Sequence, residues 1–389
     1  QVLLLLLEHI GIDFKYYFMK KILLWLVMAL LLVSCSEKTP QELFDSSKSG
    51  VVLIINKFYY RMKLPNGNFV YFTGIDDDGS LKDMCTEYKD IKDKCQILSG
   101  TGFFIDEQGS LLTNRHVAQP EIDKEAVKNG FNQMISSLRA YYAEQMSEMS
   151  QYYQVLENQK GDCYAYDEDG ESYEDTEKLQ EIESQQSELE EQFDKVKAVK
   201  EALMENVSMD ELQITPVCEI GIAYNGTHVS SYSEVLQRNP CAVVKVSGKE
   251  NVDLALIQLK DRVTPNDCHV FKTDGSANLS MAEELKEKFS SHDDKTLQID
   301  QELYMIGYNA GPTLANTQQG IQVQMTSGKV TQLPDGERVL YSIPTVQGSS
   351  GSPVIDAKGR LVAVNFAKLI GSDNFNFGIP LARVEEFLK

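Results

Sequence analysis

The run Gly348-Ser349-Ser350-Gly351-Ser352-Pro353 constrains this chain more than any other segment, because two glycines and a proline surround a central serine. A glycine two positions before Ser350 lets the backbone adopt conformations that other residues reach only at a cost. In such a turn the N–H groups of Gly348 and Ser350 converge on one point and can stabilise a developing oxyanion. A strand pattern follows at 360–364. The segment therefore predicts a rigid turn with Ser350 as a candidate nucleophile.

A histidine follows a predicted β-hairpin. Residues 99–105 and 110–113 are β-type runs on either side of the glycine-containing turn 106–109. His116 comes just after the second run, where a side chain is held rigidly and can still reach a cleft. A single histidine is more often a core or surface residue, so His116 becomes a candidate base only in combination with other residues.

Asp253 lies near the start of the segment 251–259, whose apolar residues predict a buried strand. Asp253 is thus an acid that enters a core, and a buried acid must be paired. Taken alone, an aspartate at the start of a strand or in a turn would explain this position equally well.

His116, Asp253 and Ser350 follow one another in the order found in chymotrypsin-like serine proteases, and each local context resembles that family. Residues 113–118 resemble the Thr-Ala-Ala-His box of trypsin-like proteases, residues 253–256 resemble their Asp-hydrophobic-Ala-Leu strand, and residues 348–353 resemble Gly-Asn-Ser-Gly-Gly-Pro. Ser352 in place of the second glycine resembles the bacterial glutamyl-endopeptidase branch. The resemblance covers the chain in two pieces, 48–119 and 212–389.

This resemblance implies a mostly β protein with a chymotrypsin-like double β-barrel, whose active site lies between the barrels. It implies a serine endopeptidase that acts on peptides or proteins and requires no metal or cofactor. Ser350 would be the nucleophile, His116 the base and Asp253 the residue that orients it, with an oxyanion hole from the Gly348 and Ser350 N–H groups. Two alternatives stay open: a catalytically inactive, protease-like surface binding protein acting through a helical insertion, and an esterase with the same triad.

The substrate pocket is less well indicated. Pro344 stands six residues before Ser350, where trypsin-type enzymes have an acid, so cleavage after Lys or Arg is not favoured. Thr345 resembles the pocket threonine of glutamyl endopeptidases, but Asn365 stands where they have a histidine. We expect a small or apolar P1 residue, with a pocket wall formed by Val364, Asn365, Phe366 and Ala367.

A long segment is inserted between His116 and Asp253, which are 137 residues apart. Apolar residues in 121–160 are spaced mostly by three and four, and those in 179–203 follow an a/d heptad with Gln186 and Lys200 as polar exceptions. We therefore expect residues 120–211 to form an antiparallel helical hairpin with a coiled-coil seam, connected through 161–175.

Most of the negative charge lies in this insertion. The chain has 37 basic and 58 acidic residues, and residues 121–211 supply -16 of the net charge of -21. This balance argues against nucleic-acid binding, which needs clustered Lys and Arg. The simplest interpretation is that these acidic residues lie on the solvated face of the hairpin. The alternative is that the hairpin is a functional arm that gates the cleft, mediates self-association or recruits a cationic partner.

The N-terminal region predicts export. Lys20 and Lys21 precede twelve apolar residues at 22–33, followed by Ser34 and Cys35, which is the layout of a secretory signal. Twelve residues rise about 18 Å as a helix, too little for a hydrocarbon core of about 30 Å. Residues 32–35 resemble the lipobox of bacterial lipoproteins, in which the cysteine is lipidated; a plain cleaved signal is the alternative.

This pattern sets the expected processing. We expect residues 1–18 to be upstream sequence, 19–34 the signal peptide and 35–47 a tether that begins at lipidated Cys35. The protein would be anchored in the bacterial cell envelope, on a periplasmic or outer-membrane face.

Six further cysteines remain, and an even number in an exported chain permits disulfides, with fifteen connectivities if all pair. Cys85 and Cys95 are the first pair to expect, because they close a short polar loop. No cysteine or histidine spacing predicts a zinc site. The histidines without chemical neighbours in the sequence are expected at the surface: His228, His269 and His292.

Overall fold

The computed structural model describes residues 19–21, 38–166, 171–203, 212–278, 296–368 and 376–389. The chain divides into two compact units, and each is described by itself. The first comprises Gln1–Lys57, Ile97–Pro120 and Cys218–Lys389, and the second comprises Phe58–Gln96 and Glu121–Val217. The expected lipidation site Cys35 and the apolar run 22–33 lie outside the described residues.

The first unit contains two β-barrels, as the resemblance implied. In the N-terminal barrel the strands follow the order β1-β5-β6-β11-β10-β9, and pairing of β9 with β1 closes the ring. Its strands are β1 (Val51–Lys63), β5 (Gln96–Phe104), β6 (Ser110–Thr113), β9 (Gln213–Tyr224), β10 (Pro240–Val246) and β11 (Ala255–Leu259). The expected hairpin is formed by β5 and β6, with Phe103 opposite Leu112.

The C-terminal barrel is closed in the order β12-β15-β16-β19-β18-β17. It comprises β12 (Glu302–Gly307), β15 (Gln324–Gln332), β16 (Val339–Tyr341), β17 (Pro353–Asp356), β18 (Leu361–Lys368) and β19 (Asn376–Pro380). The expected last strand is β19, and the expected C-terminal helix is α10 (Leu381–Leu388).

The continuous apolar runs of this unit follow from burial of both strand faces. In β1, Val52 and Ile54 belong to the interior cluster of the N-terminal barrel, whereas Leu53 and Ile55 belong to a second cluster. That second cluster also contains Tyr304 and Ile306 of β12, so it is a core shared by the two barrels. Each fully buried aliphatic side chain contributes about 1.5–3 kcal/mol, and the shared core therefore fixes one barrel against the other.

The expected tether is partly folded, which corrects the prediction for residues 35–47. Helix α2 (Pro40–Ser47) begins with a capping box in which Thr39 and Glu42 satisfy each other's backbone N–H groups. Leu43 is fully buried in the shared core. Residues 40–47 thus belong to the folded unit. Burial of Leu43 stabilises the helix against the core, whereas in a solvated tether this side chain would stay in water.

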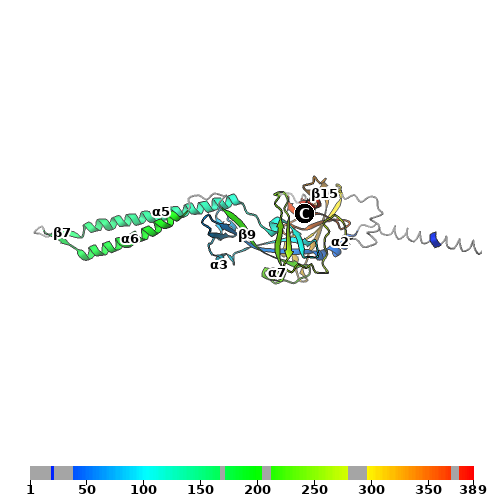
Figure 1. The fold of residues 1–389 in the computed structure, drawn as a ribbon, viewed down its shortest axis with the longest axis horizontal. Helices are drawn as coiled ribbons and strands as arrows, with labels where there is room; N and C mark the ends of the chain where they lie inside the picture. The colour runs from blue at the N-terminus through cyan, green and yellow to red at the C-terminus, as the bar shows by residue number, and fades with distance from the viewer. Residues whose placement is uncertain (1–18, 22–37, 167–170, 204–211, 279–295, 369–375) are drawn as a thin grey trace, which may run out of the picture. The chain divides into compact units, whose positions relative to one another are not determined.

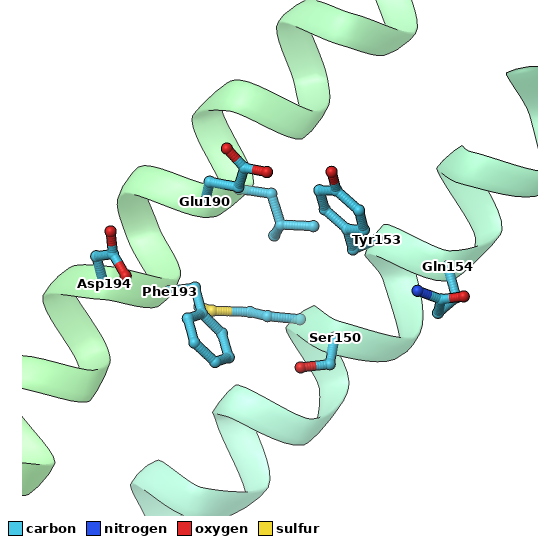
Figure 2. Close-up of a pocket in the computed structure, with 8 residues that line it drawn as sticks. Ser150, Tyr153, Gln154, Glu190, Phe193 and Asp194 are labelled. Carbon is cyan, nitrogen blue, oxygen red and sulfur yellow. The ribbon is translucent and has the colours of Figure 1, made fainter.

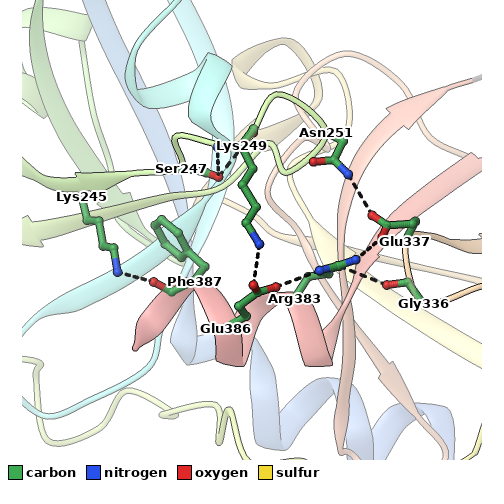
Figure 3. Close-up of polar contacts among 9 residues, drawn as sticks. All are labelled: Lys245, Ser247, Lys249, Asn251, Gly336, Glu337, Arg383, Glu386 and Phe387. Carbon is green, nitrogen blue, oxygen red and sulfur yellow. Dashed lines mark hydrogen bonds and ion pairs between the residues drawn. The ribbon is translucent and has the colours of Figure 1, made fainter.

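Helix α10 connects the two barrels through polar contacts (Figure 3). Lys249, in the loop after β10, pairs with Glu386, and Arg383 pairs with Glu337 in the loop before β16. Lys245 of β10 donates to the carbonyl of Phe387 and lies over its ring. The loop that leads to Asp253 is thereby held against the C-terminal helix.

The second unit contains the helical hairpin predicted for the insertion. Helices α5 (Lys124–Gly161) and α6 (Thr176–Ala202) run side by side, and their connection includes the small hairpin of β7 (Tyr164–Tyr166) and β8 (Ser172–Glu174) (Figure 1). Asp123 and Asp175 cap the two helices by accepting bonds from first-turn N–H groups. Heptad-position Gln186 is buried and bonds to Glu157 across the seam.

Residues 58–96 group with the hairpin, not with the barrels. Their elements are the outer part of β1, β2 (Phe69–Phe72), β3 (Gly74–Ile75), β4 (Leu81–Lys82) and α3 (Tyr88–Ile91). Tyr60, Phe72 and Phe131 share one apolar cluster at the base of α5. The boundaries expected at 119 and 212 did not anticipate this grouping and stay a prediction.

The expected Cys85–Cys95 disulfide is not formed, and none of the six described cysteines is part of a disulfide. The Cys85 thiol lies 3.5 Å from the carbonyl of Glu87, whereas the Cys95 thiol lies 3.4 Å from that of Lys92. Each sulfur thus points to a carbonyl close to it in the sequence, not to the other sulfur.

In the described ranges, no helix has both the length and the apolar character that a membrane span requires.

Candidate active site

His116 and Asp253 form a close pair in the first unit. His116 lies in the short helix α4 (Arg115–Ala118), directly after β6. Its Nδ1 lies 2.6 Å from Asp253 Oδ2, and its backbone N–H donates to Asp253 Oδ1 over 3.0 Å. With an ionised carboxylate, this contact assigns the proton to Nδ1 and leaves Nε2 as the acceptor. The imidazole is therefore fixed in both orientation and tautomer.

The residues on either side of this pair hold the aspartate in place. Asp253 lies two residues before β11, not at its first position as expected. The Asn114 side chain donates to the Asp253 carbonyl over 2.8 Å. The Arg115 guanidinium donates to the carbonyls of Ser247 and Lys249 over 3.0 and 3.1 Å. Neighbours of the histidine thus fix the loop that carries its partner, a role the motif alone did not reveal.

Ser350 lies in a loop, residues 346–352, that we call the serine loop, and this loop is bonded to the N-terminal barrel. The Thr101 N–H of β5 donates to the Ser350 carbonyl over 2.9 Å. Gly351 has a φ of 86°, and a Cβ there would lie 2.2 Å from the Thr101 carbonyl oxygen and 3.2 Å from the Asn114 nitrogen. The serine loop therefore reaches the strand end that precedes His116. In the described part of the chain, no hydrogen bond joins the Ser350 hydroxyl to His116.

The peptide groups around Ser350 have a defined orientation. The Ser349 carbonyl accepts from the Asn365 side chain over 3.0 Å and from the Ser352 N–H over 3.1 Å. Because C=O and N–H point in opposite directions in a trans peptide, the Ser350 N–H points away from Asn365. Gly348 has a φ of 99°, and its carbonyl accepts from the Thr101 hydroxyl over 2.9 Å. Neither Gly348 nor Ser350 donates its N–H to an acceptor among the described residues.

Asn365 of β18 is held by a buried tyrosine. The Tyr341 hydroxyl of β16 donates to Asn365 Oδ1 over 2.7 Å and also lies 3.1 Å from the Phe377 carbonyl. Burial raises the pKa of Tyr341 far above its usual value, so it remains a donor. The sequence placed Asn365 in a pocket wall and contained no signal for its contact with Ser349, because the two residues come from different segments.

The other predicted pocket residues have mixed environments. Pro344 is exposed, whereas Thr345 is buried and donates to Asn376 Oδ1 over 2.6 Å. Val364 is buried in the shared core, and half-buried Phe366 lies at a ring distance of 6.3 Å from Phe377. The structure does not describe the side chain of Ala367.

Within the described residues, no group of three acidic, cysteine or histidine side chains is close enough for a metal ion.

The two closed six-stranded barrels form a trypsin-like fold, and the helical hairpin is a long insertion in its sequence. Residues 218–364 match the family model of the trypsin-like peptidase domain. This match and the fold support a serine protease.

A search of solved structures finds, among others, the crystal structure of the serine endoprotease from Yersinia pestis. The identity is 10%, the TM-score is 0.39, and the alignment covers 91% of this chain. The chain spans 66% of the length of that protein. No curated protein sequence matches the chain.

Proposed function

We propose that this protein is a serine endopeptidase with Ser350 as nucleophile, His116 as general base and acid, and Asp253 as the residue that orients the imidazole. The contact that carries the proposal is the 2.6 Å approach of His116 Nδ1 to Asp253, next to a serine loop bonded to the same barrel. The ring and the backbone N–H of His116 contact the two carboxylate oxygens of Asp253, and Asn114 holds the Asp253 carbonyl. A histidine with only a structural role would not need its partner to be held at this many points.

Each step uses atoms of this site. Ser350 Oγ attacks the scissile carbonyl while His116 Nε2 takes the hydroxyl proton. We expect the Gly348 and Ser350 N–H groups to donate to the oxyanion that forms, and each such donor is worth about 10²–10³ in kcat. The imidazolium, stabilised by Asp253, protonates the leaving amine. Water then enters, His116 takes its proton, and the acyl-serine ester is hydrolysed.

A fluorophosphonate probe tests this proposal, because it phosphonylates only an activated serine. We expect the folded protein to be labelled at Ser350, as located by mass spectrometry of the proteolytic peptides. His116→Ala should abolish labelling while the circular dichroism spectrum is unchanged, and exposed His228→Ala is the matched control. Absence of label in folded protein would favour the inactive binding protein.

The natural setting is a further proposal that rests on the signal pattern. Exported and lipidated at Cys35, the protein would act on peptides or proteins at the cell envelope. Expression of the full chain in a bacterium tests this: the wild type should sediment with membranes, and Cys35→Ala should be released into the soluble fraction. Equal sedimentation of both would contradict lipid anchoring.

The preference at P1 is proposed from the pocket residues. Exposed Pro344 offers no charge for Lys or Arg, so we propose small or apolar P1 residues. Because Ser352 stands where most trypsin-like proteases have a second glycine and so resembles the glutamyl-endopeptidase branch, a preference for Glu at P1 is the competing outcome. Cleavage of a peptide library with equal representation at P1 decides between them, because a glutamyl enzyme would cleave after Glu.

A further inference from the structure

The helical hairpin of the second unit contains an open cavity between its two helices. Its volume is about 390 Å³. Figure 2 shows Tyr153 of α5 next to Glu190 of α6, with Phe193 between the helices. Four apolar side chains and four polar ones line the cavity: Met149, Tyr153, Leu189 and Phe193, and Ser150, Gln154, Glu190 and Asp194.

The seam of the hairpin is closed near its tip and open at the cavity. Leu156 and Ile182 are only 1% and 4% exposed, so the helices pack tightly there. About two to three turns further from the tip, Met149 and Phe193 are half-buried. Half-buried apolar side chains around an open space gain stability when a further apolar surface covers them. The cavity is therefore a surface to which apolar groups can bind.

The surroundings of the cavity are mostly acidic. Residues 140–159 and 179–194 together contain nine Asp or Glu and no Lys or Arg, and Lys195, directly after this range, pairs with Glu191. A hydrogen bond to the Glu190 carboxylate, followed by desolvation and the charges of Glu190 and Glu157, raises the pKa of Tyr153. A second copy of the hairpin would bring like charges together, which disfavours self-association at this site.

We propose that this cavity docks an amphipathic helix of another protein, with an apolar face in the seam and Lys or Arg along its edges. A third helix laid along two others fills the gap with its apolar side chains. Its basic residues then pair with Glu190 and Asp194 and with the neighbouring acids. The proposal concerns the second unit alone and does not depend on the proposed peptidase activity.

Fluorescence anisotropy with the full chain tests it, in a Ser350→Ala background so that the probe is not cleaved. The probe is a fluorescein-labelled helical peptide of about 18 residues with a leucine face and lysine edges. We expect saturable binding that weakens as salt screens the charges. A peptide with glutamate in place of lysine should not bind, nor should a Leu/Lys peptide of scrambled order.

Two double variants separate the site from general attraction. Glu190→Gln with Asp194→Asn removes two charges at the cavity, and we expect binding to weaken about three- to tenfold. Glu177→Gln with Glu201→Gln removes two exposed charges from the two ends of the same helix, outside the ranges counted above, and should have little effect. Phe193→Ser should also weaken binding, with helicity checked by circular dichroism. Equal weakening by both double variants, no binding of the Leu/Lys peptide, or a dimer in sedimentation that the peptide does not dissociate would overturn the proposal.

Discussion

The backbone N–H of Thr101 donates to the carbonyl of Ser350 over 2.9 Å, although the two residues are separated by most of the first unit's sequence. The Thr101 hydroxyl also donates to the Gly348 carbonyl, and the Thr101 carbonyl accepts from the Thr113 hydroxyl. One residue of β5 thus connects the serine loop to the strand that leads to His116. The geometry of the candidate site depends on this junction between the barrels.

Replacing Asp253 by Asn should nearly abolish peptide hydrolysis. The amide keeps a hydrogen bond to His116 Nδ1 but donates it, so Nε2 would carry the proton and could not accept one from Ser350. We expect kcat to fall by about 10⁴-fold. Peptide turnover under single-turnover conditions measures this, with exposed Asp261→Asn as the control. A loss smaller than tenfold would remove Asp253 from the mechanism.

Replacing Tyr341 by Phe should lower kcat by about tenfold with KM nearly unchanged. The variant loses the donor to Asn365, so the carboxamide that holds the Ser349 carbonyl can turn, and the Ser350 N–H is less well aimed at the oxyanion. The stability cost should be about 1–2 kcal/mol.

Tyr308→Phe is the matched control for this variant. It removes another buried hydroxyl, which donates to Val51 over 3.2 Å and does not contact the serine loop. A similar stability loss with unchanged kcat is expected. If both variants lower kcat equally, Asn365 is not a positioning residue.

Replacing Gly351 by Ala should unfold the serine loop or destabilise the protein by about 3–5 kcal/mol, since a positive φ and a steric clash add together. Gly336→Ala separates the two effects, because Gly336 has a φ of 84° but nothing within 4 Å of an added Cβ. It should cost only about 1–2 kcal/mol. Urea unfolding curves measure both, and equal losses would mean that the approach of Gly351 to Thr101 is unimportant.

His269 should make the protein less stable at acidic pH. It was expected at the surface, but burial, with a smaller effect of Lys38, lowers its pKa from 6.5 to about 4. Its Nε2 lies 3.2 Å from the Asn278 amide nitrogen, which favours the neutral ring. Below pH 6.5 the unfolded chain binds a proton that the folded chain does not. The free energy of unfolding should therefore decrease as pH falls from 6.5 towards 4.

The decrease from this residue should be about 2 kcal/mol between pH 7.5 and 5. Urea unfolding at both pH values measures it as the difference between wild type and His269→Gln. Exposed His228→Gln should keep the wild-type slope. An unchanged slope in His269→Gln would show that this histidine is accessible to protons in the folded state.

Local structure was predictable from the sequence. The glycines of the run 348–353 predicted a special turn, and Gly348 and Gly351 do adopt positive φ. Three- and four-residue spacing predicted two helices, because helical periodicity places such residues on one face. Apolar runs predicted strands buried on both sides. The order of His116, Asp253 and Ser350 predicted a triad; the structure brings His116 and Asp253 into contact, and the role of Ser350 stays a prediction.

The tertiary structure alone decided the contacts between distant segments. That Asn365 holds Ser349, that Thr101 joins the serine loop to the other barrel and that Leu43 is buried depend on strand register and barrel closure. Nothing in the periodicity of one segment encodes its register with another. The same limit applies to Cys85 and Cys95: ten residues of separation allowed a disulfide, but the backbone directs the two sulfurs to different carbonyls.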